Sequence, residues 1–252
     1  MSNGRYCMKT SWETVTVDDG PMRLYLCQPE STGAVPAIVV IQNQDGVGEF
    51  TQEMTRRVAE AGYVGIAPDL YHRNTPEMNG DHSQRAASRK DVGVIKDVNA
   101  AVDFLRGCAT ADVGKLGIVG FCMGGRVAFL MAAANPMFRA AVDYYGGGVY
   151  KAWGDGVAPS DRAAEIHCPI QGHFGELDKN PPADEMRTLD AELTRLGKSH
   201  EFYFYPNAGH AFNRKGWDGY RPEADTTSWP RTLDYFGKHL ADVVSRKAAG
   251  AR

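Results

Sequence analysis

The sequence predicts an α/β protein with a mostly parallel central sheet, helices on both faces of that sheet and an antiparallel hairpin at the N-terminal end. Short, uninterrupted apolar runs alternate with helix-like stretches through most of the 252 residues, which is typical of parallel strands covered on both faces. Residues 13–29 instead alternate apolar and polar side chains around an Asp-Asp-Gly turn, which is typical of a half-buried hairpin. No repeat or Pro-, Gly- or Ser-rich linker divides the chain, so we expect one domain over residues 1–252.

Six strands are expected after the hairpin, each from a short apolar run. The first run reads Ala-Ile-Val-Val-Ile without a polar residue, so both of its faces should be buried. The runs lie at residues 37–41, 63–67, 116–119, 140–145, 166–174 and 202–205.

Five helices are expected between or after these strands. In the second one, Val94, Val98 and Leu105 belong to an apolar stripe that recurs every three or four positions, so one face should pack on a core. Residues 71–82 and 146–165 are the least regular and follow strands, where the loops of such sheets build functional sites. The helical stretches run over residues 51–61, 83–106, 123–135, 183–196 and 227–245.

Composition excludes several function classes. The chain has 28 Lys and Arg against 31 Asp and Glu, so it lacks the excess of positive charge that binds the phosphates of nucleic acid. No apolar run approaches the roughly 20 residues of a membrane span, and the N-terminus has no hydrophobic signal core. We expect a cytoplasmic protein that binds neither nucleic acid nor a membrane.

The five cysteines point to neither disulfides nor a metal. They are odd in number, widely spaced and without a C-x-x-C pair, which disfavours a disulfide framework and a zinc knuckle. His167, Cys168 and His173 lie close in sequence but lack metal-ligand spacing, so packing is the better interpretation. No G-x-G-x-x-G opens a helix after the first strand. We expect no metal and no cofactor.

The segment from Lys115 to Arg126 carries the clearest signal for chemistry. An apolar strand leads into Gly-Phe-Cys-Met-Gly-Gly at residues 120–125, and a helix follows. This is the pattern of a nucleophile elbow with Cys122 where serine is usual. The glycines allow a crowded backbone, and a helix N-terminus favours a thiolate. The alternative is a glycine-rich turn around a buried structural cysteine.

A cysteine nucleophile needs a base, and in this architecture an acid and then a histidine follow the nucleophile along the chain. His210 is the best candidate because its loop directly follows the strand at 202–205. Asp178 follows the preceding strand and would orient His210, with Glu176 as its nearest competitor. The remaining histidines after Cys122 are expected to be structural: His167, His173, His200 and His239.

Together these motifs resemble the dienelactone hydrolase family, the carboxymethylenebutenolidases of the α/β-hydrolase fold. The resemblance covers nearly the whole chain and implies a single α/β-hydrolase domain with a Cys-His-Asp triad. Cysteine in the elbow is its most specific element. The matching segments are Gly-Phe-Cys-Met-Gly-Gly, Pro-Asp-Leu-Tyr-His-Arg at 68–73, Asp-Tyr-Tyr-Gly at 143–146, Gly-Glu-Leu-Asp at 175–178 and Ala-Gly-His-Ala-Phe-Asn-Arg at 208–214.

By this resemblance Cys122 would be the nucleophile, His210 the base and Asp178 its orienting acid. Arg73 and Arg214 match arginines that hold the substrate carboxylate in the family. That role suits arginine because its planar fork grips a carboxylate at two positions.

The sequence departs from the family at one position. The family has a glutamate that helps to activate the cysteine, and Asn43 occupies its place. Asparagine cannot take a proton, so either His210 alone deprotonates Cys122 or Asp45 has taken over. The next backbone N–H, at Gln44, would pair with that of Met123 in an oxyanion hole.

The expected activity is hydrolysis of a small lactone or ester, with a carboxylate on the substrate and a thioester acyl-enzyme. Tyr145 ends a strand near the proposed site and is expected in the pocket, whereas Trp153, Trp217 and the other aromatics are expected to pack. Two alternatives stay open. One is hydrolysis or acyl transfer with other small esters or thioesters. The other is a catalytically idle scaffold that binds a small acid or a protein.

Overall fold

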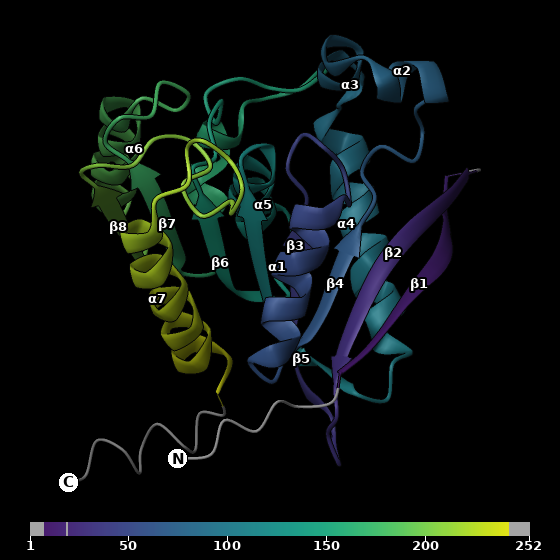
Figure 1. Ribbon diagram of the computed structural model, residues 1–252. Helices are drawn as coiled ribbons and strands as arrows, with labels where there is room; N and C mark the ends of the chain where they lie inside the picture. Colours follow the sequence, from purple (N-terminus) through teal and green to yellow (C-terminus); the bar gives the residue numbers. More distant parts are fainter. Residues whose placement is uncertain (1–7, 19, 242–252) are drawn as a thin grey trace, which may run out of the picture.

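The computed structural model describes residues 8–18 and 20–241. Eight strands form one sheet in the order β1-β2-β4-β3-β5-β6-β7-β8 (Figure 1). The strands are β1 (Met8–Val17), β2 (Gly20–Pro29), β3 (Val35–Ile41), β4 (Val64–Pro68), β5 (Ala111–Phe121), β6 (Phe138–Tyr144), β7 (Ile170–Gly175) and β8 (His200–Tyr205).

The helices alternate with the strands, as expected from the sequence. They are α1 (Glu49–Glu60), α2 (Pro76–Gly80), α3 (His82–Ser88), α4 (Asp91–Arg106), α5 (Met123–Ala134), α6 (Ala183–Arg195), α7 (Pro222–Leu240) and the 3₁₀ helix η1 (Pro159–Glu165). No helix within residues 8–18 and 20–241 is both long enough and apolar enough to cross a membrane.

The sheet is antiparallel only at its N-terminal end. Strand β1 pairs with β2, and β2 with β4, in antiparallel register. From β4 to β8 every neighbouring pair is parallel. The predicted fold class is therefore confirmed, including the hairpin that adds an antiparallel edge.

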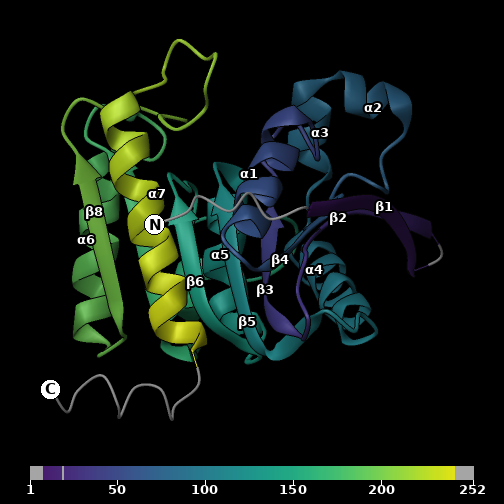
Figure 2. The ribbon, with the colours of Figure 1, turned by 60° about the horizontal axis from the view of Figure 1, so that its bottom comes forward.

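Two hydrophobic cores lie on opposite faces of the sheet. In Figure 2, α1 and α7 lie in front of the sheet, and α4, α5 and α6 lie behind it. Strand β3 serves both cores, because Val39 and Ile41 pack with α4 and α5 whereas Ile38 and Val40 pack with α1 and α7. This two-sided burial explains why the strand has no polar residue.

The prediction of one helix over residues 83–106 is wrong. Arg89 and Lys90 are extended and separate α3 from α4. The N–H of Asp91 donates to the Trp153 carbonyl at 2.9 Å instead of continuing the first helix. The Asp91 carboxylate binds both Nη atoms of buried Arg126, at 2.6 and 3.0 Å. Contacts with distant parts of the chain therefore start a new helix here.

Smaller boundary errors have local causes. Strand β7 begins at Ile170 and not at residue 166, because Pro169 has no N–H to donate to a neighbouring strand. Helices α2 and η1 form within segments that were expected to be irregular. Helix α7 begins at Pro222, five residues before the predicted start, and residues 242–245 of that prediction lie outside the described residues.

Candidate active site

Cys122 lies in the sharp turn between β5 and α5. Its φ is 59° and its ψ is −122°, a conformation that is strained for a residue with a side chain. Added Cβ atoms would lie 1.8 Å from the Gly124 oxygen at Gly120 and 2.0 Å from Asp143 Oδ1 at Gly125. Only glycine fits this close approach. The predicted strand, turn and helix are therefore present around the thiol.

Loops after three different strands bring Cys122, Asp178 and His210 together. The Nδ1 atom of His210 lies 2.8 Å from Asp178 Oδ2, and the ring lines one groove together with Cys122 and Asp178. The side chain of Asp178 is 2% exposed, whereas that of His210 is 35% exposed. The carboxylate is thus inside the protein and the imidazole reaches the surface of the site.

The electrostatics of the site favour a charged imidazole. Burial by itself lowers the pKa of His210, but the hydrogen bonds and charges of Asp178 and Cys122 outweigh burial and raise this pKa to about 10. A cation at this position is adjacent to the sulfur. The arrangement can therefore hold a proton on His210 beside the Cys122 sulfur.

Two depressions reach the sulfur. A narrow pocket of about 50 Å³ carries three aromatic residues and Arg214, and an open groove of about 420 Å³, which shares Gln44, Cys122 and His210 with the pocket, carries Lys179. The pocket is lined by Asn43, Gln44, Phe50, Cys122, Tyr145, His210, Ala211, Arg214 and Trp217. The groove is lined by Gln44, Cys122, Leu177, Asp178, Lys179, Asn180 and His210.

Arg214 lies in the pocket and is held by neighbours on two sides. Its Nη1 donates to Asp45 Oδ2 at 2.8 Å, and its guanidinium lies 4.9 Å from the centre of the Trp217 ring. Asn43 Oδ1 accepts the backbone N–H of Asp45 at 3.0 Å. Asp45 is therefore engaged by both residues and does not line either depression with Cys122.

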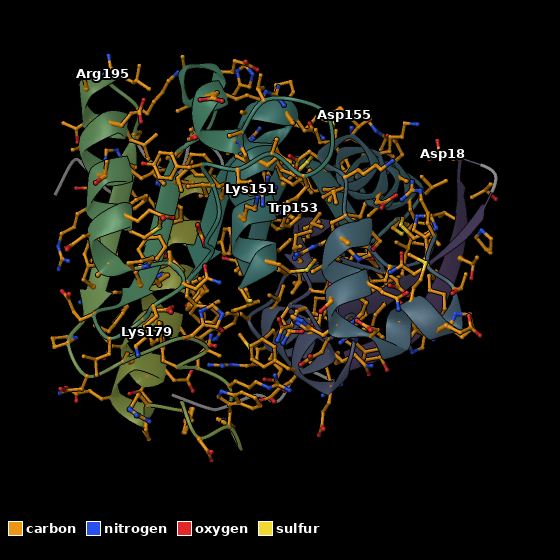
Figure 3. The ribbon with its side chains drawn as sticks, turned by 90° about the horizontal axis from the view of Figure 1, so that it is seen from above. Asp18, Lys151, Trp153, Asp155, Lys179 and Arg195 are labelled. Atoms are coloured by element: carbon orange, nitrogen blue, oxygen red, sulfur yellow. The ribbon has the colours of Figure 1, made fainter. Side chains whose placement is uncertain are left out.

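The structure does not bring Arg73 to the site, contrary to the role that the resemblance implied. Its guanidinium donates to Asp97 at 2.7 Å and to Asp18 at 2.9 Å. Seen from above, Asp18 and Lys179 lie on opposite flanks of the molecule (Figure 3). Asp18 and Asp97 therefore hold Arg73 on the flank where Asp18 lies. Arg73 lines neither depression that reaches the sulfur.

The remaining expected residues lie near the sulfur. Tyr145 has a φ of 44°, is buried, and donates its hydroxyl proton to Asn213. In the part of the chain that the structure describes, the backbone N–H groups of Gln44 and Met123 have no acceptor. Gln44 is anchored by its side chain, which bonds His82 at 2.5 Å.

Sequence reasoning missed the aromatic wall of the pocket. Trp217 was expected to pack, yet it is 54% exposed and lines the pocket with Phe50. Its position in the irregular segment after His210 was the available signal, because such loops border the site. Among the described residues, no three His, Cys, Asp or Glu side chains form a group that could hold a metal ion.

Comparisons with known proteins identify the relatives of this chain. A family model described as the dienelactone hydrolase family matches residues 22–240. A protein of Methylorubrum extorquens named as a carboxymethylenebutenolidase is 35% identical over 235 residues, which are 89% of this chain and 79% of the relative. A Bradyrhizobium protein named as a 2-oxo-3-(5-oxofuran-2-ylidene)propanoate lactonase is 34% identical over 90% of this chain and 96% of its own length.

A solved structure agrees with this result. The crystal structure of a protein from Klebsiella pneumoniae, named as a dienelactone hydrolase, has a TM-score of 0.86 and 30% sequence identity. The match covers 92% of this chain and 99% of that one. The two proteins therefore share the α/β-hydrolase fold over nearly their whole length.

Proposed function

This chain belongs to the dienelactone hydrolase family, and we propose that it hydrolyses a small lactone or ester with Cys122 as the nucleophile. Hydrolase activity of the carboxymethylenebutenolidase type is supported by its relatives. The observation that carries the proposal is that Cys122, Asp178 and His210 line one groove, with His210 Nδ1 2.8 Å from Asp178 Oδ2.

The first step forms an acyl-enzyme. The Cys122 thiolate attacks the carbonyl carbon, and the oxyanion accepts hydrogen bonds from the Gln44 and Met123 N–H groups. When the tetrahedral intermediate collapses, the ring or ester oxygen leaves and takes the proton of the His210 imidazolium. The products of this step are a thioester on Cys122 and a free hydroxyl or enol.

The second step releases the acid. Neutral His210 removes a proton from water, and the resulting hydroxide attacks the thioester carbonyl. Collapse of the second intermediate breaks the carbon–sulfur bond and restores the thiolate beside the imidazolium. The balance is one lactone and one water in, and one hydroxy acid out.

His210 is the base in this proposal, without help from a residue that replaces the family glutamate. Asn43 cannot accept a proton. Asp45 accepts from Arg214 at 2.8 Å and binds Asn43, so its carboxylate is occupied. Among the described residues, no hydrogen bond links the Asp45 carboxylate to the Cys122 sulfur. Because Asn43 carries no charge, the counter-charge of the Cys122 thiolate in this proposal is the His210 imidazolium.

We further propose that the substrate carries a carboxylate that Arg214 binds. Arg214 lines the same pocket as Cys122, and the ion pair with Asp45 uses only one of its two Nη groups. In the described part of the chain Nη2 has no hydrogen-bond partner, so it can donate to a carboxylate. The Bradyrhizobium relative is named for a lactone with a propanoate group. Tyr145 and Asn43 would form the pocket wall around the substrate.

The test compares two cysteine variants. Cys122→Ala should lower kcat/KM for dienelactone and for aryl esters by at least about 10³-fold, because loss of a triad member removes covalent catalysis. The matched control is Cys108→Ala, since Cys108 is a half-buried free thiol outside the site. Mass spectrometry of the wild type should detect an acyl group on Cys122. Unchanged turnover in the first variant would end the proposal.

A further inference from the structure

The two depressions that reach Cys122 differ greatly in size. The narrow pocket has a volume of about 50 Å³ and the groove one of about 420 Å³. Because a cavity of roughly 150 Å³ holds one benzene ring, the pocket has room for a carboxylate or a methyl group but not for a ring. An ester with a larger body therefore has to place that body in the groove.

The groove is part of the reaction site. It is lined by Cys122 and His210, and also by Gln44, whose backbone N–H has no acceptor in the described part of the chain. A group that lies in the groove is therefore next to the nucleophile, the base and one oxyanion donor. The groove can thus select substrates through contacts that form while the carbonyl carbon is at the sulfur.

Lys179 supplies the groove with an available cation, and it is the one lysine or arginine among the described residues that line it. Both carboxylate oxygens of the adjacent Asp178 are engaged elsewhere, because Oδ2 lies 2.8 Å from His210 Nδ1 and Oδ1 accepts the Asn180 N–H at 2.9 Å. Over residues 8–18 and 20–241, the Lys179 ammonium forms no hydrogen bond or ion pair. Its backbone forms a bridge with Pro182, so the loop is held while the exposed ammonium can bind a ligand.

Leu177 adds an apolar surface to the same groove. It is 63% exposed and lies two positions before Lys179, in the loop after β7. A groove that combines an apolar wall with one cation fits a ligand with an apolar body and an anionic end. The carboxylate of Asp178 does not oppose such a ligand with a free charge, because it is paired with His210.

The cation of the groove is separate from the two arginines that were considered for the substrate carboxylate. Arg214 lines the narrow pocket and not the groove. Arg73 pairs with Asp18, and Lys179 and Asp18 lie on opposite flanks of the molecule (Figure 3). An anionic group in the groove would therefore meet Lys179 and neither arginine.

We propose that the groove is a subsite for the larger part of the substrate, and that Lys179 gives this subsite a preference for an anionic group. The ligand class is a small ester whose apolar body, such as an aromatic ring, ends in a carboxylate. The inference rests on the proposed function, which places the scissile carbonyl at Cys122. Lys179 is then a specificity-determining residue for that reaction.

Two aryl acetates test the subsite with the full-length protein. In para-acetoxybenzoate and its methyl ester the acetyl methyl group fits the narrow pocket, whereas the ring fits only the groove. The measured quantity is the ratio of kcat/KM for the charged ester to kcat/KM for the neutral ester. Because every variant is given the same two esters, differences in their intrinsic reactivity cancel when ratios are compared.

Substitutions of Lys179 should change this ratio according to charge. Lys179→Gln should lower it by roughly two- to fivefold, the range expected for an ion pair that stays in contact with water. Lys179→Glu should lower it further, by about tenfold or more in total, because repulsion replaces attraction. Lys179→Arg should keep the wild-type ratio. An unchanged ratio in Lys179→Glu would overturn the inference.

Two further variants control for other cations. Lys151→Gln removes an exposed lysine that lines neither depression and should keep the ratio. Arg214→Gln tests the competing location: if it abolishes the preference while Lys179→Gln does not, the carboxylate binds in the narrow pocket and the subsite is wrong. Thermal melting should show that each variant is folded, which is expected because Lys179 and Lys151 are exposed.

The neutral ester separates this inference from the proposed function. If Cys122→Ala hydrolyses the neutral ester as fast as the wild type does, the proposed function fails and the subsite loses its basis. If Cys122→Ala is inactive but all Lys179 variants keep the wild-type ratio, the proposed function stands and the subsite alone is contradicted.

Discussion

His173 and His210 belong to neighbouring parts of the same sheet and have opposite properties. His173 lies in β7, fully buried, with its Nδ1 2.8 Å from the Tyr205 hydroxyl and its Nε2 2.8 Å from Gln171 Oε1. Burial lowers the pKa of His173 to about 3. His210 follows β8 and contacts Asp178, and its pKa is raised to about 10.

The two pKa values differ because the two rings have different hydrogen-bond partners. The partners of His173 are neutral, so nothing offsets the cost of burying a charged ring. Asp178 places a carboxylate oxygen 2.8 Å from His210 Nδ1, and the His210 side chain is 35% exposed. One imidazole is therefore a packing element held neutral, and the other can carry a proton. The structural role expected for His173 agrees with its satisfied hydrogen bonds.

The largest expected effect is the loss of catalytic activity when His210, and not His173, is replaced. His210→Gln should lower kcat/KM for an aryl ester by at least about 10³-fold, because the base and the counter-charge of the thiolate are lost together. His173→Gln should change kcat/KM by less than about tenfold, since His173 lines neither depression at the sulfur. Steady-state kinetics on both variants measures this, and similar losses would break the comparison.

The next largest effect concerns Asp178, whose carboxylate contacts His210 and not His173. Asp178→Asn should lower kcat by about 10²–10³-fold, because the amide no longer stabilises the imidazolium. The pKa of His210, followed by NMR of its ring, should also fall from about 10. Glu176→Gln is the matched control, since Glu176 pairs with Arg187 instead. If Glu176→Gln causes the larger loss, Glu176 is the orienting acid.

The two rings should also give opposite pH dependences of stability. Below its ordinary pKa of 6.5, His173 binds a proton only when unfolded, so its contribution is complete above pH 6.5 and is lost as pH falls toward 3. His210 contributes fully below pH 6.5 and loses that contribution as pH rises toward 10. Each slope is at most about 1.4 kcal/mol per pH unit.

Urea unfolding at a series of pH values measures these slopes. His173→Gln should flatten the acid side of the stability profile, and His210→Gln should flatten the alkaline side. Burial raises the pKa of Asp143 to about 8 and the charge of His210 opposes that shift, so His210→Gln should also move the Asp143 titration to higher pH on the alkaline side. The reverse assignment of the two sides would contradict the charge states described above.

The smallest effect tests the neutral environment of His173. Tyr205→Phe removes the hydroxyl that lies 2.8 Å from His173 Nδ1 and should lower the free energy of unfolding by about 1–2 kcal/mol, because one buried ring nitrogen is left without a partner. Aryl-ester turnover should be unaffected. Chemical denaturation measures the change, and a stabilised variant would show that this hydrogen bond is unimportant.

Much of the fold was accessible from local sequence patterns. Short apolar runs predicted the strands β3 to β8, with the largest boundary error at the start of β5, which is Ala111 and not residue 116. Strand β3 is buried on both faces and has no polar side chain, whereas β7 also contains the buried polar residues Gln171 and His173. Gly120 and Gly125 predicted the turn at Cys122, because no other residue fits there. The chain order of Cys122, Asp178 and His210 followed from the strand order, which puts their loops at one edge of the sheet.

The tertiary structure alone decided how the charges pair. Arg73 binds Asp18 across 55 positions of the chain, and Arg214 binds Asp45 across 169. The break between α3 and α4 depends on Arg126 and Trp153 in the same way. Local patterns report which residues are buried, but an ion pair forms between whichever side chains the sheet order brings within a few ångströms. That distance is a property of the folded chain and has no local signature.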